Sequence, residues 1–190
     1  MGASPRVGVM GMGDISRPVR TILVVDDSRT NLNVIGERLT ALGYLTALVD
    51  NGAEALDLIT GRGFDLIVLD LMMPEMDGIQ VLAELRSRTE TSDLPVIVVT
   101  ARSDPEAAVD VLAAGADDHL AKPFDFEVLA ARIDRTLARA RRISDLKRSN
   151  AALDARIAAR AMELGEARAE LADIRADRER LIAEVERLRA

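Results

Sequence analysis

Short apolar runs alternate with helix-like stretches along residues 20–140 of the chain. Five runs are rich in Val, Ile and Leu and have the length of strands that are buried on both faces of a sheet. The predicted strands are 22–25, 44–49, 66–69, 96–99 and 117–121. The helices predicted after them cover 32–42, 51–59, 79–86, 105–114 and 125 onward. This alternation predicts an α/β domain with a doubly wound, five-stranded parallel sheet and helices on both faces.

Residues with special backbone preferences mark several predicted boundaries. Gly43 is placed to end the first helix. The Asp-Pro-Glu sequence that begins at Asp104 provides the N-cap, the proline and the acidic first turn of the fourth helix. Residues 1–18 contain glycines and prolines without periodicity, so we expect a flexible leader there.

Residues 143–189 carry a heptad pattern in place of this alternation. Position a holds Ile143, Asn150, Ile157, Leu164, Leu171, Arg178 and Val185, and position d holds Leu146, Leu153, Arg160, Ala167, Ile174, Leu181 and Leu188. Nearly seven heptads without proline predict a coiled coil, and a single solvated helix is the alternative. Asn150, a single amide at an a position, specifies the register of a parallel homodimer. The pairs that attract each other only in such a dimer are Glu163–Arg168, Glu170–Arg175 and Glu184–Arg189.

The two patterns divide the chain into three parts. We expect a leader over 1–18, the α/β domain over 19–140, and a helix for dimerisation and signal transmission over 141–190. No glycine or proline lies between Pro123 and Gly165, so the last helix of the domain is expected to continue into the coiled coil without a break.

Composition narrows the functional classes. The chain has no cysteine, which excludes disulfides and thiolate metal sites. Residues 19–142 hold 13 Lys/Arg and 21 Asp/Glu, a balance of −8 that exceeds the net charge of −7 of the chain, and an acidic domain is a poor partner for nucleic acid. The basic run from Arg135 to Arg148 follows Asp134 and is interrupted by Asp145, and these acidic residues argue against a DNA-binding role for this segment. No apolar run approaches the roughly 20 residues of a membrane span, and no signal peptide is recognisable. We therefore expect a cytoplasmic protein with no membrane partner.

Polar residues follow four of the predicted strands. Asp26 and Asp27 follow the first strand, Asp70 the third, Thr100 the fourth and Lys122 the fifth. Because parallel strands end at the same edge of a sheet, these groups are expected to converge there. Three carboxylates repel one another unless a cation neutralises them. An oxygen-only ligand set favours Mg²⁺ as that cation.

This constellation suits phosphoryl transfer to a carboxylate. Asp70 is the candidate nucleophile, since an aspartyl-phosphate is a known type of covalent intermediate. The Lys122 ammonium, the Thr100 hydroxyl and backbone N–H groups would hold the oxygens of the transferred group. Each residue also has a plainer interpretation by itself. Asp27 or Ser28 could cap the following helix, Thr100 could be an ordinary hydroxyl at a strand end, and Lys122 could be a solvated surface lysine. Their joint occurrence at the correct strand ends favours the site.

Four motifs carry a family resemblance. They are VVDDS at 24–28, VLDLMMPEMDG at 68–78, VTA at 99–101 and the Lys122-Pro123 pair. In order and spacing they resemble the receiver domain of two-component response regulators, over roughly residues 20–140. The resemblance implies a flavodoxin-like receiver fold and a phosphorelay function. It also implies that Asp70 is phosphorylated by a histidine kinase or a histidine phosphotransfer protein.

The resemblance further assigns roles to individual positions. Asp26, Asp27, Asp70 and the backbone carbonyl of Met72 would hold Mg²⁺. Thr100, the backbone of Ala101 and Lys122 would bind the phosphate and act in the switch, and the bond before Pro123 is expected to be cis.

Three further positions follow from the same resemblance. The aromatic residue that this family commonly has three positions before the lysine is His119 here, the only histidine of the chain, and an imidazole ring can still rotate. Met72 and Arg102, each two residues beyond a site residue, are expected to flank the path of water to the phosphate and to slow its loss.

Alternative functions remain open at the level of sequence. The chain is expected to be a signalling protein and not an enzyme, with a downstream effector that the sequence does not specify. One alternative is the regulatory fragment of a larger output enzyme, such as a nucleotide cyclase, phosphatase or kinase. Another is a Mg²⁺-dependent phosphatase of the haloacid dehalogenase type, although that class needs an acid where Met72 stands. A third is a scaffold in which the receiver only docks partners.

Overall fold

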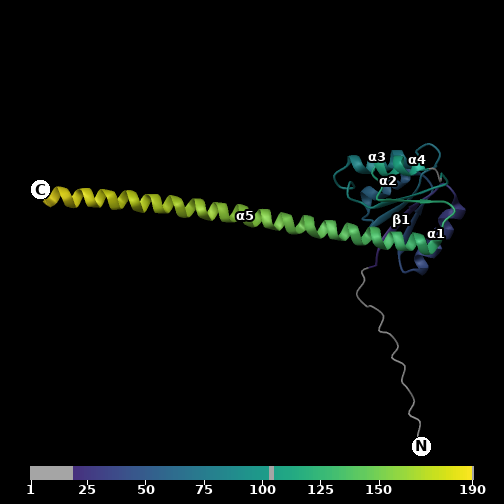
Figure 1. Ribbon diagram of the computed structural model, residues 1–190, viewed down its shortest axis with the longest axis horizontal. Helices are drawn as coiled ribbons and strands as arrows, with labels where there is room; N and C mark the ends of the chain where they lie inside the picture. The colour runs from purple at the N-terminus through teal and green to yellow at the C-terminus, as the bar shows by residue number, and fades with distance from the viewer. Residues whose placement is uncertain (1–18, 103–104, 190) are drawn as a thin grey trace, which may run out of the picture. The chain divides into compact units, whose positions relative to one another are not determined.

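A computed structural model describes residues 19–102 and 105–189 (Figure 1). Strands and helices alternate along the chain. The strands are β1 (Thr21–Val25), β2 (Leu45–Val49), β3 (Leu66–Asp70), β4 (Val96–Thr100) and β5 (Asp118–Ala121). The helices are α1 (Arg29–Ala41), α2 (Gly52–Gly61), α3 (Gly78–Ser87), α4 (Pro105–Ala113) and α5 (Phe126–Arg189). The predicted alternation of five strands with five helices is confirmed.

The strands form one parallel sheet in the order β2-β1-β3-β4-β5. The chain moves outward from β1 to β2 and then returns to the other side of β1 with β3. The order therefore reverses between β1 and β3, whose last paired residues are Val25 and Leu69. Open α/β sheets bind ligands at such a switch point, beyond the carboxyl ends of the strands. The doubly wound, flavodoxin-like fold that the sequence predicted is confirmed.

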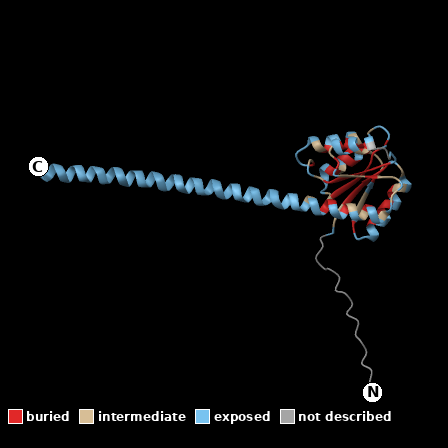
Figure 2. Cartoon of the chain, viewed as in Figure 1, coloured by how far each residue is buried: buried red, intermediate tan, exposed pale blue. Residues whose placement is uncertain are grey.

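Two apolar clusters cover the two faces of the sheet. Alternate residues of β1 point to opposite faces: Leu23 belongs to the cluster with α2, α3 and α4, and Val24 to the cluster with α1 and α5. Figure 2 shows the buried residues gathered in the strands and in the helix faces that meet them. Because β1, β3 and β4 are buried on both faces, their sequences are continuous apolar runs.

Local signals account for several helix ends. The Ser28 side chain accepts the backbone N–H of Asn31 at the start of α1. Asp77 and Gln80 form a reciprocal capping box at the start of α3. Gly43 has a φ of 87° and follows α1, as the sequence predicted, because glycine tolerates this left-handed conformation. The predicted N-cap Asp104 and the predicted leader over 1–18 lie outside the described residues.

Three predicted strand starts are wrong by one residue, and the first strand begins at Thr21 and not at Ile22. The second strand begins at Leu45 and not at Tyr44, whose hydroxyl donates to Asp134 Oδ1 of α5 at 2.6 Å. The fifth begins at Asp118 and not at Asp117. The carboxylate of Asp117 instead accepts the backbone N–H of Val96 at 3.0 Å. Tyr44 and Asp117 each lie directly before the first paired residue of their strand.

The contacts divide the chain into two units after Ala140. Helix α5 is continuous to Arg189, so the prediction that the last helix runs on without a break is confirmed. In the second unit the described side chains, 141–189, are exposed (Figure 2). Ion pairs between residues three apart lie along this surface, such as Arg160–Glu163 at 2.9 Å. Within the described residues, no helix combines the length and the apolarity that crossing a membrane requires.

Candidate phosphoacceptor site

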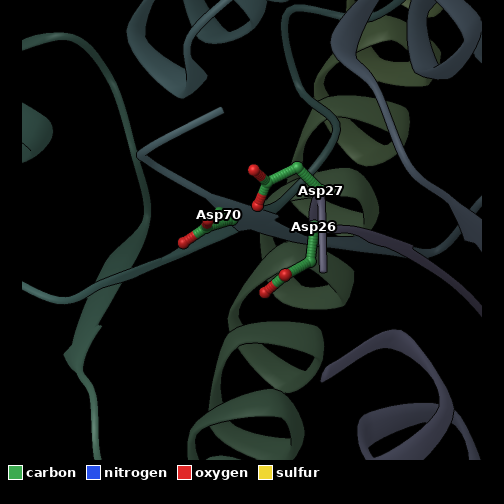
Figure 3. A group of neighbouring side chains, drawn as sticks. All are labelled: Asp26, Asp27 and Asp70. Atoms are coloured by element: carbon green, nitrogen blue, oxygen red, sulfur yellow. The ribbon is translucent and has the colours of Figure 1, made fainter. Parts of the chain in front are cut away.

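Three carboxylates meet at the switch point of the sheet. Asp26 and Asp27 directly follow β1, and Asp70 is the last residue of β3. Each offers an oxygen that lies within 4.8 Å of the others (Figure 3). Asp26 and Asp70 are buried, whereas Asp27 is exposed. The structure therefore brings together the three acidic residues that the sequence placed at one edge.

Lys122 joins this cluster from the end of β5. Its Nζ donates to Asp26 Oδ2 at 2.7 Å and to Asp70 Oδ1 at 2.9 Å. Both ion pairs are largely shielded from solvent. The peptide bond between Lys122 and Pro123 is cis. Residues 96 positions apart in the chain thus contact each other because their strands share one direction.

Burial and the charges of this cluster shift the pKa values of Asp70 and Lys122. Burial raises the pKa of Asp70, and the ammonium of Lys122 offsets this only in part, while the charges of Asp26 and Asp27 add to the rise. Burial lowers the pKa of Lys122, but its hydrogen bonds to Asp26 and Asp70 and their charges outweigh that effect and raise it. The lysine is therefore a fixed positive charge beside the candidate nucleophile.

Asn31 is a site residue that the sequence analysis did not identify. Its Nδ2 donates to Asp26 Oδ1 at 3.0 Å and to Asp26 Oδ2 at 3.2 Å. The backbone N–H of Ser28 also donates to Asp26 Oδ1, at 2.9 Å. These bonds hold the buried Asp26 carboxylate in place. The signal in the sequence was an amide side chain one turn into a helix that follows two acidic residues.

Gly78 is a second site residue, to which the sequence analysis gave no role beyond its place at the end of the motif at 68–78. A Cβ added there would lie 2.5 Å from the backbone carbonyl oxygen of Asp70 and 2.9 Å from the Cα of Leu71. The N–H of Gly78 donates to the carbonyl oxygen of Leu71 at 2.9 Å. The loop after β3 therefore closes back on the backbone of Asp70 so tightly that only glycine fits.

The expected switch residues lie at the ends of the neighbouring strands. Thr100 is buried, and its hydroxyl accepts the backbone N–H of Arg102 at 3.0 Å. Ala101 is exposed. His119 lies on β5 opposite Val98 of β4 and is partly buried. Their roles in binding phosphate and in switching stay predictions.

Met72 and Arg102 line one cavity of about 520 Å³ together with Asp27. The Met72 side chain is 59% exposed. The cavity is therefore bordered by one carboxylate of the cluster and by both residues that were expected to flank the approach of water. The position of Met72 and Arg102 supports the expectation that they flank the approach of water. Their effect on the rate of phosphate loss stays a prediction.

The acidic cluster fits Mg²⁺ in its donor atoms, spacing and charge. Two oxygens on opposite sides of this ion are about 4.2 Å apart when each metal–oxygen distance is about 2.1 Å, and the three carboxylate oxygens lie within 4.8 Å of one another. One ammonium leaves three carboxylates with an excess of two negative charges. Asp26, Asp27 and Asp70 are the side chains that would hold the ion, and the carbonyl of Met72 stays a predicted fourth ligand.

Replacing Asp27 with asparagine is expected to weaken Mg²⁺ binding by at least about tenfold, because it removes one of the negative charges that attract the ion. Isothermal titration of the full chain with MgCl₂ measures this change. Asp57→Asn, at an exposed position of α2, is the matched control and should bind as wild type does. Unchanged affinity in Asp27→Asn would remove Asp27 from the ligand set.

Comparison with known proteins agrees with this geometry. The family model of the response regulator receiver domain matches residues 22–134. The response regulator MprA of Mycobacterium sp. (strain KMS) is 48% identical over 122 residues, which are 64% of this chain and 52% of the relative. The chain thus spans about half the length of this curated relative.

Solved structures show the same fold. The receiver domain of a signal transduction histidine kinase from Syntrophus aciditrophicus is 38% identical with a TM-score of 0.60, and the match covers 63% of this chain and 91% of that one. The receiver domain of a Francisella response regulator is 35% identical with a TM-score of 0.60, over 63% of this chain and 98% of that one. The family match extends over more than half of the residues, so this chain belongs to the response regulator receiver domain family.

Proposed function

We propose that the chain accepts a phosphoryl group on Asp70 from the phosphohistidine of a histidine kinase or a histidine phosphotransfer protein. The observation that carries this proposal is the buried Asp70 carboxylate, which contacts Lys122 and lies within an acidic cluster at the switch point. Helix α5 would pass the state of the domain to a downstream protein. The family membership supports a partner that carries phosphohistidine.

The proposed transfer exchanges one bond for another. An oxygen of Asp70 attacks phosphorus, the phosphorus–nitrogen bond to the donor imidazole breaks, and that imidazole retains the electron pair and takes up a proton. Lys122 has a raised pKa and stays charged, so its ammonium can move from Asp70 to an oxygen of the transferred group. The Thr100 hydroxyl and the N–H of Ala101 would hold further oxygens. A bound Mg²⁺ would offset the negative charge that the carboxylates and the phosphoryl group bring together.

The position two residues after Asp70 separates this proposal from a phosphatase. A haloacid dehalogenase-type phosphatase needs a second acid there to protonate the leaving group, and this chain has Met72. An aspartyl-phosphate on this chain is therefore expected to persist rather than turn over. A regulatory segment of a larger output enzyme, the alternative that the sequence left open, stays the second candidate.

Incubation of the full chain with Mg²⁺ and acetyl phosphate tests the proposed function. We expect one phosphoryl group per chain, no steady release of phosphate from phosphoesters, and no labelling in EDTA. Steady turnover of phosphoesters would support the phosphatase and contradict the proposal. Absence of any adduct would support a scaffold that does not accept phosphate.

Replacing Met72 with asparagine is expected to speed the loss of phosphate severalfold. The Met72 side chain borders the cavity beside Asp27, where a bulky apolar group obstructs or fails to orient water, whereas an amide can orient it. The decay of phosphorylated protein after removal of the donor gives the rate. Val109→Asn, at an exposed position of α4, is the control. Equal decay of Met72→Asn and wild type would show that this side chain does not limit the approach of water.

A further inference from the structure

We propose that the second unit binds a second copy of this chain as a parallel, in-register, two-stranded coiled coil. The partner is a second α5 helix, and the surface is the stripe of a and d positions between Ile143 and Leu188. This dimer goes beyond the proposed phosphoryl transfer and does not depend on it, because the stripe contains none of the site residues.

An uncovered apolar stripe is the first observation. Ten apolar side chains at a and d positions are between 41% and 82% exposed. They are Ile143, Leu146, Leu153, Ile157, Leu164, Leu171, Ile174, Leu181, Val185 and Leu188. Their period of 3.5 residues matches the seam of a supercoiled pair and not the wider face of a helix that packs on a globular core. A second helix with the same spacing covers the entire stripe.

The residue types at the seam favour two strands. Ile or Val occupies several a positions, and Leu occupies most d positions, which is the distribution of parallel dimers. Asn150 is the only amide among the seam residues. In an in-register pair it meets the partner's Asn150, whereas a shift by one heptad would bury it against Ile143 or Ile157. Asn150 therefore fixes the register.

The flanking charges decide the orientation. From Glu163 onward the g positions are acidic: Glu163, Glu170, Asp177 and Glu184. The e positions over the same length are Arg168, Arg175, Ile182 and Arg189. In a parallel pair each g side chain meets the following e side chain of the other helix, so three of the four acids meet arginines and Asp177 meets Ile182. In an antiparallel pair g meets g and e meets e, so like charges meet. Because the g flank is acidic and the e flank is mostly basic, the charges favour the parallel arrangement.

The two seam arginines are compatible with this pair. The NH1 group of Arg160 donates to Glu163 Oε2 at 2.9 Å, which draws its charge from the seam toward the flank. Arg178 occupies an a position, where a side chain packs beside the preceding g residue of the other helix. That residue is the partner's Asp177, a carboxylate of opposite charge. Neither arginine is left without an acid in a parallel pair.

A parallel dimer has a consequence for signalling. Both α/β domains are attached to the amino-terminal end of the coil and both carboxyl termini lie at the other end. One dimer therefore carries two Asp70 phosphoacceptors, and a downstream partner at the far end meets two identical helices. The seam contains no group that phosphorylation alters, so the coil is expected to hold the dimer in both states.

Cysteine cross-linking of the full chain tests the pairing, because wild type contains no cysteine. Leu153→Cys and Leu181→Cys place one thiol at a d position in each half of the coil. Only in a parallel, in-register pair do identical d positions approach closely enough for a disulfide at both sites. Ala155→Cys and Ala183→Cys are matched controls on the outer face of the same turns.

In a thiol redox buffer without phosphodonor, we expect both Leu variants to form disulfide-linked dimers and both Ala variants to stay uncrosslinked. Absence of cross-links in both Leu variants, although the chain has the mass of a dimer, would show that identical d positions do not face each other and would overturn the parallel, in-register pairing. A wild-type mass of 20.6 kDa by light scattering at micromolar concentration would overturn the dimer itself. Acetyl phosphate labelling of the same samples reports on Asp70 separately, so failure of the dimer and failure of the proposed function are distinguishable.

A charge exchange tests the orientation without a thiol. A variant with Glu163→Arg, Glu170→Arg and Glu184→Arg has two basic flanks and is expected to be monomeric at low salt. A second variant with Arg168→Glu, Arg175→Glu and Arg189→Glu has two acidic flanks. We expect an equimolar mixture of the two to form a one-to-one dimer. A homodimer of either variant as stable as wild type would contradict the g-to-e pairing.

Discussion

Replacing Asp70 with asparagine is expected to abolish phosphorylation and to leave the fold intact. The amide has the shape of the carboxylate but lacks its nucleophilic charge. Its oxygen can still accept the hydrogen bond that Lys122 now donates to Asp70 Oδ1. Mass spectrometry of the intact chain after incubation with acetyl phosphate and Mg²⁺ measures the adduct. Asp57→Asn should be labelled as wild type is, and an adduct on Asp70→Asn at the wild-type level would reject Asp70 as the acceptor.

The same substitution has an expected effect on stability, with a definite sign. Burial raises the pKa of Asp70, so folding favours the protonated form. This favourable contribution is complete below the pKa of the unfolded chain and is lost as the pH rises through the higher pKa of the folded state. At neutral pH the ionised carboxylate therefore destabilises the metal-free domain, and asparagine does not.

In EDTA, we accordingly expect the free energy of unfolding of Asp70→Asn to equal or exceed that of wild type. The difference should grow as the pH rises from acid toward neutral. Addition of Mg²⁺ should stabilise wild type more than the variant, by about 1.4 kcal/mol at ten times the dissociation constant of the wild-type ion complex. Urea titrations followed by circular dichroism measure these quantities. A variant that is strongly destabilised in EDTA at neutral pH would show that Asp70 has a structural role that was not anticipated.

A chain that ends at Arg142 is expected to be monomeric when it is unphosphorylated. The truncation removes the apolar stripe that begins at Ile143, while the buried α5 residues Leu129, Ile133 and Leu137 stay in place. Solved receiver domains such as that of the Francisella response regulator match over nearly their whole length and cover only 63% of this chain, so the domain is expected to fold without the coil.

Light scattering of the truncated and full-length chains at equal micromolar concentration measures this loss. The full chain should have the mass of a dimer, and the truncated chain that of a monomer. A dimer of the truncated chain that forms only after phosphorylation would be consistent with a switching surface on the receiver. A tight dimer of the truncated, unphosphorylated chain would show that the receiver holds the pair together and that the coil does not.

The part of the site that could be predicted from the sequence lies at strand ends. Asp70 directly ends a continuous apolar run, and the geometry of a parallel sheet determines where such a residue lies. Asp26, Asp27 and Lys122 were placed at the same edge for the same reason. The strands themselves were predictable because burial on both faces requires uninterrupted Val, Ile and Leu.

What was missed depends on contacts between segments that local sequence does not encode. Asn31 binds Asp26 through its amide, and although it lies at the start of α1 just after two acidic residues, the sequence alone does not show which group that amide contacts. Gly78 is required because a loop closes on the Asp70 carbonyl, a tertiary approach that a turn signal does not reveal. Tyr44 was included in the second strand, but the pairing begins at Leu45, and the Tyr44 hydroxyl donates to Asp134 of α5.

The most direct measurement of the central claim is chemical trapping of the phosphorylated residue in the full-length wild-type chain. Borohydride reduces an acyl phosphate to an alcohol and so converts a phosphorylated aspartate to homoserine, which peptide mass spectrometry locates. After incubation with acetyl phosphate, we expect homoserine at position 70, only when Mg²⁺ is present, and aspartate at positions 26 and 27. Homoserine at position 26 or 27 with intact Asp70, or no homoserine at all under conditions that label a known receiver domain, would contradict the account.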